Sequence, residues 1–170
     1  LNIGKEGSKK PLIEILAFCL MPNHYHLLVR QLIDNGITRF MQKLGTGYTM
    51  YFNQKNKRVG SLFQGRFKAV PIENERHFLY IPYYIHLNPL GLIEPEWQEK
   101  KLKNPTQTMK FLENYRWSSF PDYIGKKNFP SVTQRKFLSD FFDGPANHKQ
   151  STFKWLEEMN LDDIDGLTLE

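Results

Sequence analysis

The run "PLIEILAFCLMPNHYHLLVR", residues 11–30, constrains the fold more than any other part of this sequence. Residues 11–21 are almost continuously apolar, which is typical of a buried strand. Pro22 and Asn23 follow, and both residue types favour tight turns, proline by fixing φ and asparagine by tolerating left-handed backbone. The sequence therefore predicts a β-hairpin whose second strand spans residues 24–30.

Two histidines, His24 and His26, stand on either side of Tyr25 in the second expected strand. Successive side chains of a strand point to opposite faces, so the two imidazoles share one face. Imidazole is the commonest metal-binding side chain, and the pair can form half of a divalent-cation site. They can equally be ordinary polar residues on a half-exposed strand, and the short spacing leaves both interpretations open.

Two helices and one further strand are expected after the hairpin. Apolar residues recur at helical intervals over residues 37–56, and apolar and polar residues alternate over residues 61–72. The first pattern predicts an amphipathic helix and the second a strand with one cationic face. A second helix is expected over residues 73–87, kinked at Pro82 and ended by Asn88, because the residue before a proline is pushed out of helical geometry.

The length of 170 residues fits one main domain with a smaller appendage. We expect a flexible lead-in over residues 1–10, the main core over 11–92, a connector with an aromatic docking segment over 93–125, and a C-terminal helical extension over 126–170. The order of strands and helices predicts an α+β fold, with helices on one face of an antiparallel sheet. One cysteine and the lack of a long apolar segment favour a soluble, cytoplasmic protein.

Positive charge is concentrated in the first half of the chain. Residues 1–90 hold 12 Lys and Arg against 5 Asp and Glu, whereas residues 91–170 hold 11 against 13. This asymmetry favours a polyanionic partner, of which nucleic acid is the usual one. The candidate phosphate contacts cluster in two adjacent segments and are Lys55, Lys57, Arg58, Arg66 and Lys68. Each of them can also be a solvated surface charge.

Four aromatic side chains lie close to these basic residues: Tyr48, Tyr51, Phe63 and Phe67. Aromatic rings beside cationic residues can stack on unpaired bases. Packing in the core is the more frequent role of such residues, and we expect it here.

Tyr84 and Asn88 are four residues apart in the second expected helix. They project from nearly the same face, about 40° out of line. Asn88 can add an oxygen ligand to the histidine pair, and Tyr84 can act as a nucleophile, which together indicate a metal-dependent phosphoryl-transfer site. Alternatively, Tyr80, Tyr83 and Tyr84 are packing residues and Asn88 only ends the helix, and spacing alone does not decide.

Four segments, "AFCLMPNHYHLLV", "LFQGRFKA", "YIHLNP" and "YRWSSFPDYIG", carry a family resemblance. In their order and approximate spacing the chain resembles the small single-tyrosine transposases of the HUH nuclease superfamily, and most closely the REP-associated tyrosine transposases. The resemblance extends from about Glu14 to Gly125. It implies a ferredoxin-like fold, with residues 11–92 as the HUH nuclease core. The strand and helix that usually precede the hairpin in the family are expected to be absent or not included in this chain.

The resemblance also implies an activity. Members cut single-stranded DNA beside an imperfect hairpin during DNA transposition and recombination, using a divalent metal, and a tyrosine becomes joined to the 5′ phosphate while a 3′ hydroxyl is released. Carried across, His24, His26 and Asn88 are the expected ligands of Mg²⁺ or Mn²⁺, and Tyr84 is the expected nucleophile. No nucleotide cofactor or membrane partner is expected, and a monomer is favoured over a dimer.

Two other functions stay open. Tyr80 and Tyr84 lie one helical turn apart, the arrangement of rolling-circle initiators that use paired tyrosines. The third possibility is a DNA hairpin-binding module that does not cut. Binding needs only distributed positive charge, whereas cleavage also needs accurate geometry, so a chain can bind DNA without cutting it.

Overall fold

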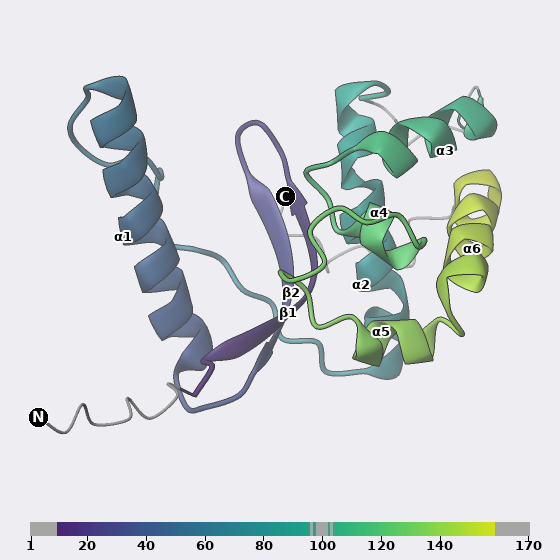
Figure 1. Cartoon of the computed structure of the whole chain (residues 1–170), viewed down its shortest axis with the longest axis horizontal. Coiled ribbons are helices and arrows are strands. Elements are labelled where there is room, and N and C mark those ends of the chain that lie inside the picture. Colours follow the sequence, from purple (N-terminus) through teal and green to yellow (C-terminus); the bar gives the residue numbers. More distant parts are fainter. Residues whose placement is uncertain (1–9, 96, 98–101, 103, 159–170) are drawn as a thin grey trace, which may run out of the picture. The chain divides into compact units, whose positions relative to one another are not determined.

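A computed structural model of the chain describes residues 10–95, 97, 102 and 104–158 (Figure 1). The chain divides into two compact units: unit 1 comprises Leu1–Glu14 and Val29–Lys68, and unit 2 comprises Ile15–Leu28 and Ala69–Glu170. Most of the predicted lead-in and the end of the predicted C-terminal extension lie outside the described residues. The predicted segment boundaries at residues 10, 92 and 125 stay predictions.

The predicted hairpin is present. Strand β1 (Ile13–Leu20) pairs with strand β2 (Tyr25–Gln31), and these are the strands of the sheet in the described part of the chain. The reversal occurs at Pro22 and Asn23, where the Met21 N–H donates to the His24 carbonyl oxygen at 2.9 Å. The apolar run of β1 is buried, with Ala17 and Cys19 both fully inaccessible to solvent, as its nearly continuous apolar sequence predicts.

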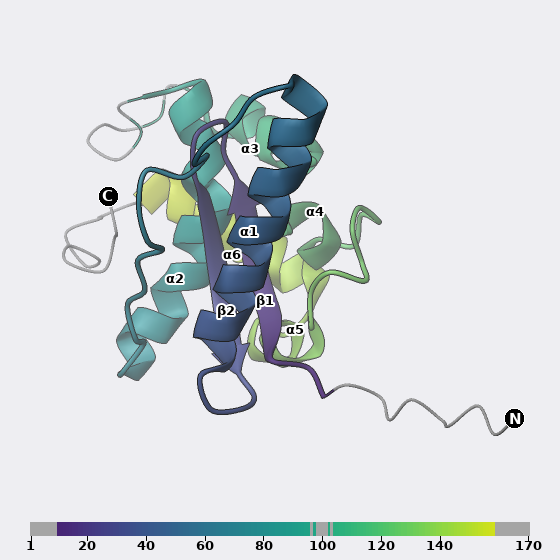
Figure 2. The ribbon, with the colours of Figure 1, turned by 90° about the vertical axis from the view of Figure 1, so that its left-hand side faces the viewer.

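Unit 1 contains one long helix, α1 (Gly36–Asn56), which confirms the helix predicted for residues 37–56. Its start requires a glycine, because a Cβ atom on Gly36 would lie 2.3 Å from the Leu12 carbonyl oxygen. The helix ends where Lys57 adopts a left-handed conformation with φ of 51°. Beyond the helix, the chain turns back along it (Figure 2). In this returning segment Phe63 contacts the Tyr48 ring at a centroid distance of 6.3 Å.

The strand predicted for residues 61–72 is wrong, because this segment forms bends and irregular backbone. A strand needs a partner for its backbone N–H and C=O groups, and no neighbouring strand accompanies it among the described residues. Local contacts shape the loop instead: the Asn53 amide donates to the Gly60 carbonyl at 2.8 Å, and the Ser61 hydroxyl donates to the Phe63 carbonyl at 2.7 Å. Alternation of residue types alone therefore did not make a strand.

Unit 2 begins its helical part with α2 (Glu75–Leu87). The Asn74 side chain caps its start by accepting from the His77 N–H at 2.9 Å. The helix continues through Pro82 and ends before Asn88, as predicted, and a short 3-10 helix η1 (Asn88–Leu92) follows. Six consecutive residues at its end, 82–87, are buried, so the last two turns of α2 lie in the core.

Four more helices complete the described part of unit 2: α3 (Pro105–Asn114), α4 (Phe120–Tyr123), α5 (Lys136–Phe141) and α6 (Pro145–Glu158). The sequence analysis missed α3, although Asn104 caps its start and Pro105 stands at its first turn. The helices of unit 2 lie on one side of the hairpin (Figures 1 and 2). The prediction of an α+β fold with an antiparallel sheet and C-terminal helices is confirmed.

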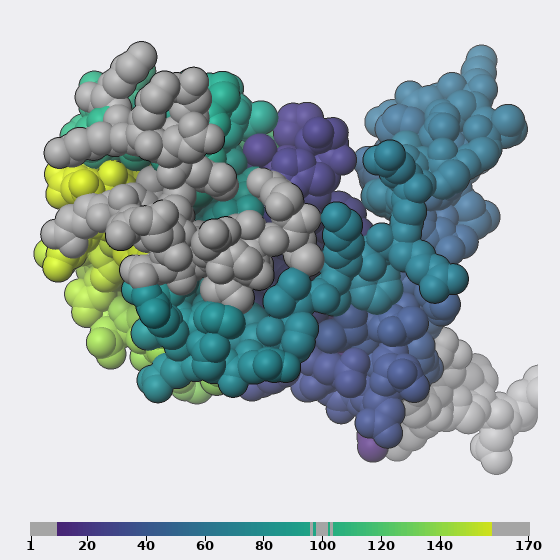
Figure 3. Space-filling model, turned by 180° about the vertical axis from the view of Figure 1, so that it is seen from behind, coloured from purple at the N-terminus to yellow at the C-terminus, as the bar shows by residue number. Residues whose placement is uncertain are grey.

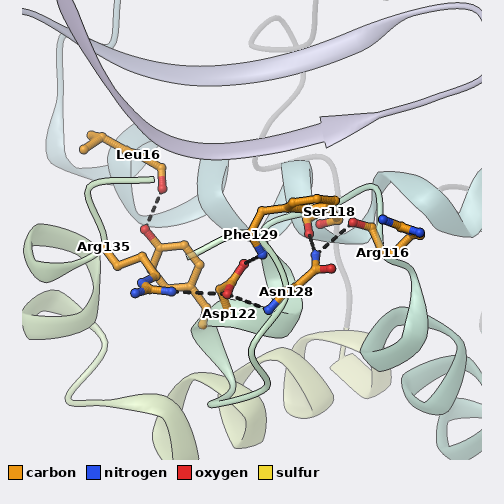
Figure 4. Close-up of polar contacts among 8 residues, drawn as sticks. Leu16, Arg116, Ser118, Asp122, Asn128, Phe129 and Arg135 are labelled. Carbon is orange, nitrogen blue, oxygen red and sulfur yellow. Dashed lines mark hydrogen bonds and ion pairs between the residues drawn. The ribbon is translucent and has the colours of Figure 1, made fainter. Parts of the chain in front are cut away.

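A short segment before α4 pairs with the edge of β1 that does not pair with β2. Ser118 forms an antiparallel bridge with Cys19, and the Leu20 N–H donates to the Trp117 carbonyl oxygen at 2.7 Å. Behind this segment, the buried Asp122 carboxylate accepts from the backbone N–H of Asn128 at 3.0 Å and of Phe129 at 2.9 Å (Figure 4). The edge of β1 is thus covered by chain from beyond the hairpin and helix α2.

Candidate functional site

The two hairpin histidines lie next to each other in unit 2. His24 closes the turn and His26 lies in β2, and both are half-buried. Their ring centroids are 5.0 Å apart with an interplanar angle of 85°. The expectation that the two imidazoles share one side of the strand is therefore met, although β2 itself begins only at Tyr25.

The turn also orients the first of these rings. His24 Nδ1 lies 2.8 Å from the Asn23 side-chain oxygen. An amide oxygen can only accept a hydrogen bond, so Nδ1 carries the proton and Nε2 of the neutral ring keeps its lone pair. That Nε2 atom is buried. In metal-binding histidines generally, the ring nitrogen that does not bind the metal donates a hydrogen bond of this kind, and that bond fixes the tautomer.

Tyr84 reaches this pair from helix α2. Its ring lies edge-on to the His26 ring, at a centroid distance of 5.6 Å and an angle of 82°. Tyr84 is only 3% exposed, and its hydroxyl oxygen is buried. The structure thus brings together His24, His26 and Tyr84, three residues that the sequence analysis placed in one site.

Asn88 lies one helical turn beyond Tyr84, at the C-cap of α2, where its backbone N–H donates to the Tyr84 carbonyl oxygen. It is 4% exposed. A cation site formed by the two histidines and Asn88 would offer two imidazole nitrogens and one amide oxygen, a set that suits a divalent ion that keeps water ligands. The described residues contain no group of three or more His, Cys, Asp and Glu side chains arranged to hold a metal.

The neighbouring tyrosines of α2 have different surroundings. The Tyr83 ring stacks on the Trp155 ring at 5.5 Å and 11°, and Tyr80 lies edge-on to the same ring at 5.1 Å. Both therefore pack against α6, whereas Tyr84 contacts the hairpin. Tyr83 and Tyr84 are consecutive and therefore about 100° apart around the α2 axis, which lets them face different neighbours.

The predicted phosphate contacts all belong to unit 1. Lys55, Lys57, Arg66 and Lys68 are exposed, as a role in DNA binding requires. Arg58 is half-buried and donates to the Ser61 carbonyl oxygen at 3.0 Å, so part of its guanidinium already holds the loop.

The aromatic residues of unit 1 differ from expectation. Core packing was wrong for Tyr48, Tyr51 and Phe67, which are 48%, 56% and 38% exposed, while Phe63 is half-buried. Helix α1 buries almost nothing: Gly36 is its buried residue. Its aromatic rings consequently remain at the surface, where Lys55 lies 5.7 Å from the centre of the Tyr51 ring.

The sequence analysis missed a second histidine pair. His86 of α2 and His148 of α6 are both buried, and His86 Nδ1 lies 3.2 Å from His148 Nε2. His86 Nε2 lies 2.9 Å from the Ser119 hydroxyl, which also accepts from the Phe18 N–H at 2.9 Å. The residues are 62 positions apart, so no local spacing could have indicated them.

One arrangement of protons satisfies all of these contacts. His148 Nε2–H donates to His86 Nδ1, His86 Nε2–H donates to the Ser119 hydroxyl, and that hydroxyl donates to the Phe18 carbonyl oxygen at 3.2 Å. Both rings are then neutral. Burial, followed by the neighbouring His148, lowers the pKa of His86 far below its ordinary value, and burial lowers the pKa of His148 to about 3.

Comparison with known proteins identifies the class and then the family. The fold is that of a small α+β protein in which two histidines and a tyrosine lie together. The family model described as "Transposase IS200 like" matches residues 1–88, which include all four expected site residues. The chain belongs to the IS200-like transposase family, and this membership implies that it processes DNA.

Two further comparisons gave no match. Neither a curated protein nor a solved structure matches this chain at the threshold applied. Among the described helices, none is both long enough and apolar enough to cross a lipid bilayer.

Proposed function

We propose that this chain is a metal-dependent, site-specific endonuclease and strand transferase that acts on single-stranded DNA beside a hairpin. In this proposal it is an HUH-type enzyme of the REP-associated, single-tyrosine group of IS200-like transposases. The observation that carries the proposal is the contact of Tyr84 with His26, at 5.6 Å between ring centroids, beside His24. A phenol and two imidazoles thereby converge where a hairpin meets a helix.

In this proposal His24, His26 and Asn88 hold one Mg²⁺ or Mn²⁺ ion. When bound, such an ion draws a nonbridging phosphate oxygen and stabilises charge on the departing oxygen. His24 supports this role because Asn23 leaves its Nε2 with a lone pair. Asn88 supports it because its amide oxygen is the hard ligand that Mg²⁺ and Mn²⁺ favour.

Tyr84 is the nucleophile of the proposed reaction. Its phenolic oxygen forms a bond to phosphorus, and the bond from phosphorus to the 3′ oxygen breaks. The phenol loses one proton and the 3′ oxygen gains one, so the products are a 5′-phosphotyrosine and a 3′ hydroxyl. The covalent bond conserves the energy of the phosphodiester, so the strand can be joined to another 3′ end without nucleotide hydrolysis.

The exposed basic residues of unit 1 hold the DNA backbone in this proposal: Lys55, Lys57, Arg66 and Lys68, with Arg58 contributing where the loop leaves it available. Such contacts give salt-dependent affinity and do not read sequence. The exposed rings of Tyr48 and Tyr51 can stack on unpaired bases beside these charges. We propose that the active species is a monomer.

One observation favours a second candidate, a hairpin-binding module that does not cut. Tyr84 is 3% exposed, so a phosphate reaches its hydroxyl only if the groups covering it move. The paired-tyrosine alternative has less support, because Tyr80 packs against Trp155 rather than the histidines in the described contacts. The following experiment separates the three functions.

A labelled oligonucleotide with a hairpin and single-stranded flanks is incubated with the full chain and Mn²⁺, and covalent protein–DNA bands are resolved by denaturing electrophoresis. The proposal expects a band for the unmodified chain and for Tyr80→Phe, and none for Tyr84→Phe. Tyr80→Phe is the matched control, because it removes the same hydroxyl one helical turn away.

Each other outcome selects a rival. Retention of the oligonucleotide without any covalent band supports the non-cleaving module. A band that persists in Tyr84→Phe and disappears only in the double variant with Tyr80→Phe supports the paired-tyrosine mechanism.

A further inference from the structure

A pocket of about 440 Å³ lies in unit 2 among α2, the end of α5 and α6. These helices lie side by side on the face shown in Figure 3, with α2 in teal and α5 and α6 in yellow-green to yellow. The volume falls within the roughly 300–1,000 Å³ of small-ligand sites. None of the candidate metal ligands, nor Tyr84, is among the residues that line it.

One wall of the pocket is a rigid group of rings. Tyr83 stacks on Trp155 at 5.5 Å, Tyr80 meets the same ring edge-on at 5.1 Å, and all three line the pocket. Rings already held by one another lose little freedom when a ligand stacks on them. This wall is therefore prepared for a flat, apolar-faced ligand.

Helix α6 also contributes polar side chains to the lining. Asn147, Ser151 and Trp155 follow one another at intervals of four on α6, so they share one face of that helix, and all line the pocket. Gln150 lines it as well, and both Asn147 and Gln150 are exposed. Their amide groups are therefore accessible to a ligand in the pocket.

The charge of the lining excludes a phosphate. Asp143 is the charged side chain among the described lining residues. A carboxylate repels phosphate and accepts hydrogen bonds from amino and imino groups, while amides both donate and accept. Aromatic faces, two amides and a carboxylate together match the faces and edge of a nucleobase that carries an exocyclic amino group.

We propose that this pocket binds one unstacked base of the single-stranded DNA, a base that bears an amino group. The inference rests on the proposed DNA substrate and extends it to a base-reading site outside the hairpin. Tyr80 precedes Tyr84 by one turn, about 6 Å along the axis of α2. In this proposal, a strand whose phosphate lies at Tyr84 places a flanking nucleotide in the pocket.

The test measures dissociation constants of the full chain without metal, by fluorescence anisotropy, so that cleavage plays no part. The probes are a hairpin oligonucleotide with single-stranded flanks and a series in which each flanking nucleotide in turn is abasic. At one position the abasic probe binds about tenfold more weakly, the effect of losing one stacked base. Tyr80→Leu should bind the intact probe about tenfold more weakly than wild type does, and making the same nucleotide abasic should cause no further loss of affinity in this variant.

Conservative variants separate stacking from folding. Tyr80→Phe keeps the ring and retains the wild-type pattern. Asn147→Ala, at an exposed position, weakens binding at the same nucleotide, whereas Gln107→Ala, an exposed amide on α3, does not. A probe with thymine at that nucleotide should bind less tightly than one with an amino-bearing base, and Asp143→Gly should remove this difference. Glycine suits position 143 because the φ of Asp143 is 54°.

The proposal is overturned if each abasic probe loses the same affinity in wild type and in Tyr80→Leu at every position. The pocket would then serve another ligand, such as a cationic side chain of a protein partner. A chain that shows the coupling but forms no covalent adduct keeps the base pocket and loses the proposed cleavage. Failure to bind the oligonucleotide at all overturns both.

Discussion

The two histidine pairs of this protein have similar ring distances and opposite surroundings. The ring centroids are 5.0 Å apart for His24 and His26 and 5.3 Å apart for His86 and His148. The hairpin pair is half-buried and lies in a turn and the strand that follows it. The second pair is 0% and 1% exposed and joins helices α2 and α6.

The difference shows that proximity of imidazoles does not define their use. A ring that is to bind a cation must keep a lone pair and admit the ion, and the proposed function assigns that role to the hairpin pair. His86 and His148 instead use their facing nitrogens on each other, and burial keeps them neutral. Because His86 lies between Tyr84 and Asn88 on α2, the second pair holds the helix that carries the candidate nucleophile.

The largest expected effect concerns the hairpin pair. His26→Ala should slow covalent adduct formation with the hairpin oligonucleotide by more than about 100-fold, because losing a ligand costs more than the 10–100-fold loss of an outer-shell partner. Its free energy of unfolding should change by less than about 1 kcal/mol, because His26 is only half-buried. Adduct yield over time and urea unfolding check the two numbers.

The same comparison has a control in the buried pair. His148→Phe keeps a ring stacked on Phe142, which lies 4.1 Å from the His148 ring, and removes the contact with His86. Its adduct rate at neutral pH should fall far less than that of His26→Ala. If the two variants lost adduct formation equally, the proposed division of roles between the pairs would be wrong.

The second effect is a loss of stability in acid. His148 has a folded-state pKa of about 3 and an ordinary value of 6.5, so the unfolded state binds a proton first as the pH falls. Stability is therefore complete above 6.5 and decreases below it, by about 3 kcal/mol near pH 4.5 at 1.36 kcal/mol per pH unit. Urea unfolding between pH 7 and 4.5 measures this slope.

His148→Phe is the matched variant for the acid experiment, because it cannot take up the proton. Its stability should vary less steeply over the same pH range. An unchanged slope would mean that other groups cause the acid sensitivity.

The smallest effect tests the orientation of His24. Asn23→Ala should lower Mn²⁺ affinity about tenfold, the lower end of outer-shell effects. In the metal-free protein at about pH 8.5, where imidazole is neutral, ¹⁵N NMR should show His24 protonated at Nδ1 in wild type and mainly at Nε2 in the variant. Asn114→Ala, an exposed asparagine on α3, should change neither quantity. A wild-type His24 protonated at Nε2 would contradict the assigned hydrogen bond.

Short-range chemistry made part of this protein predictable. The hairpin followed from an apolar run and a Pro-Asn turn, helix α1 from apolar periodicity, and the end of helix α2 from the proline after Asn88. His24 and His26 were found because a strand places alternate residues on one side. The pairing of Tyr84 with Asn88 was a helix argument, and one turn of α2 does separate them.

The failures have one physical origin. Residues 61–72 have a strand-like pattern, yet a strand exists only where another backbone completes its hydrogen bonds, and none does so among the described residues. Tyr48 and Tyr51 have the composition of core residues, but α1 has no described partner layer that buries them. Both errors concern contacts that lie far away in the sequence.

The sequence by itself determined the hairpin, helices α1 and α2 and the candidate chemistry, since turns, helix ends and the order of residues along a strand depend on neighbours a few positions away. The tertiary structure alone decided that Tyr84 meets His26, that His86 meets His148, and that α6 turns amides toward a pocket. Those choices depend on which surfaces bury each other when the chain folds, and burial is a property of the whole unit rather than of any segment.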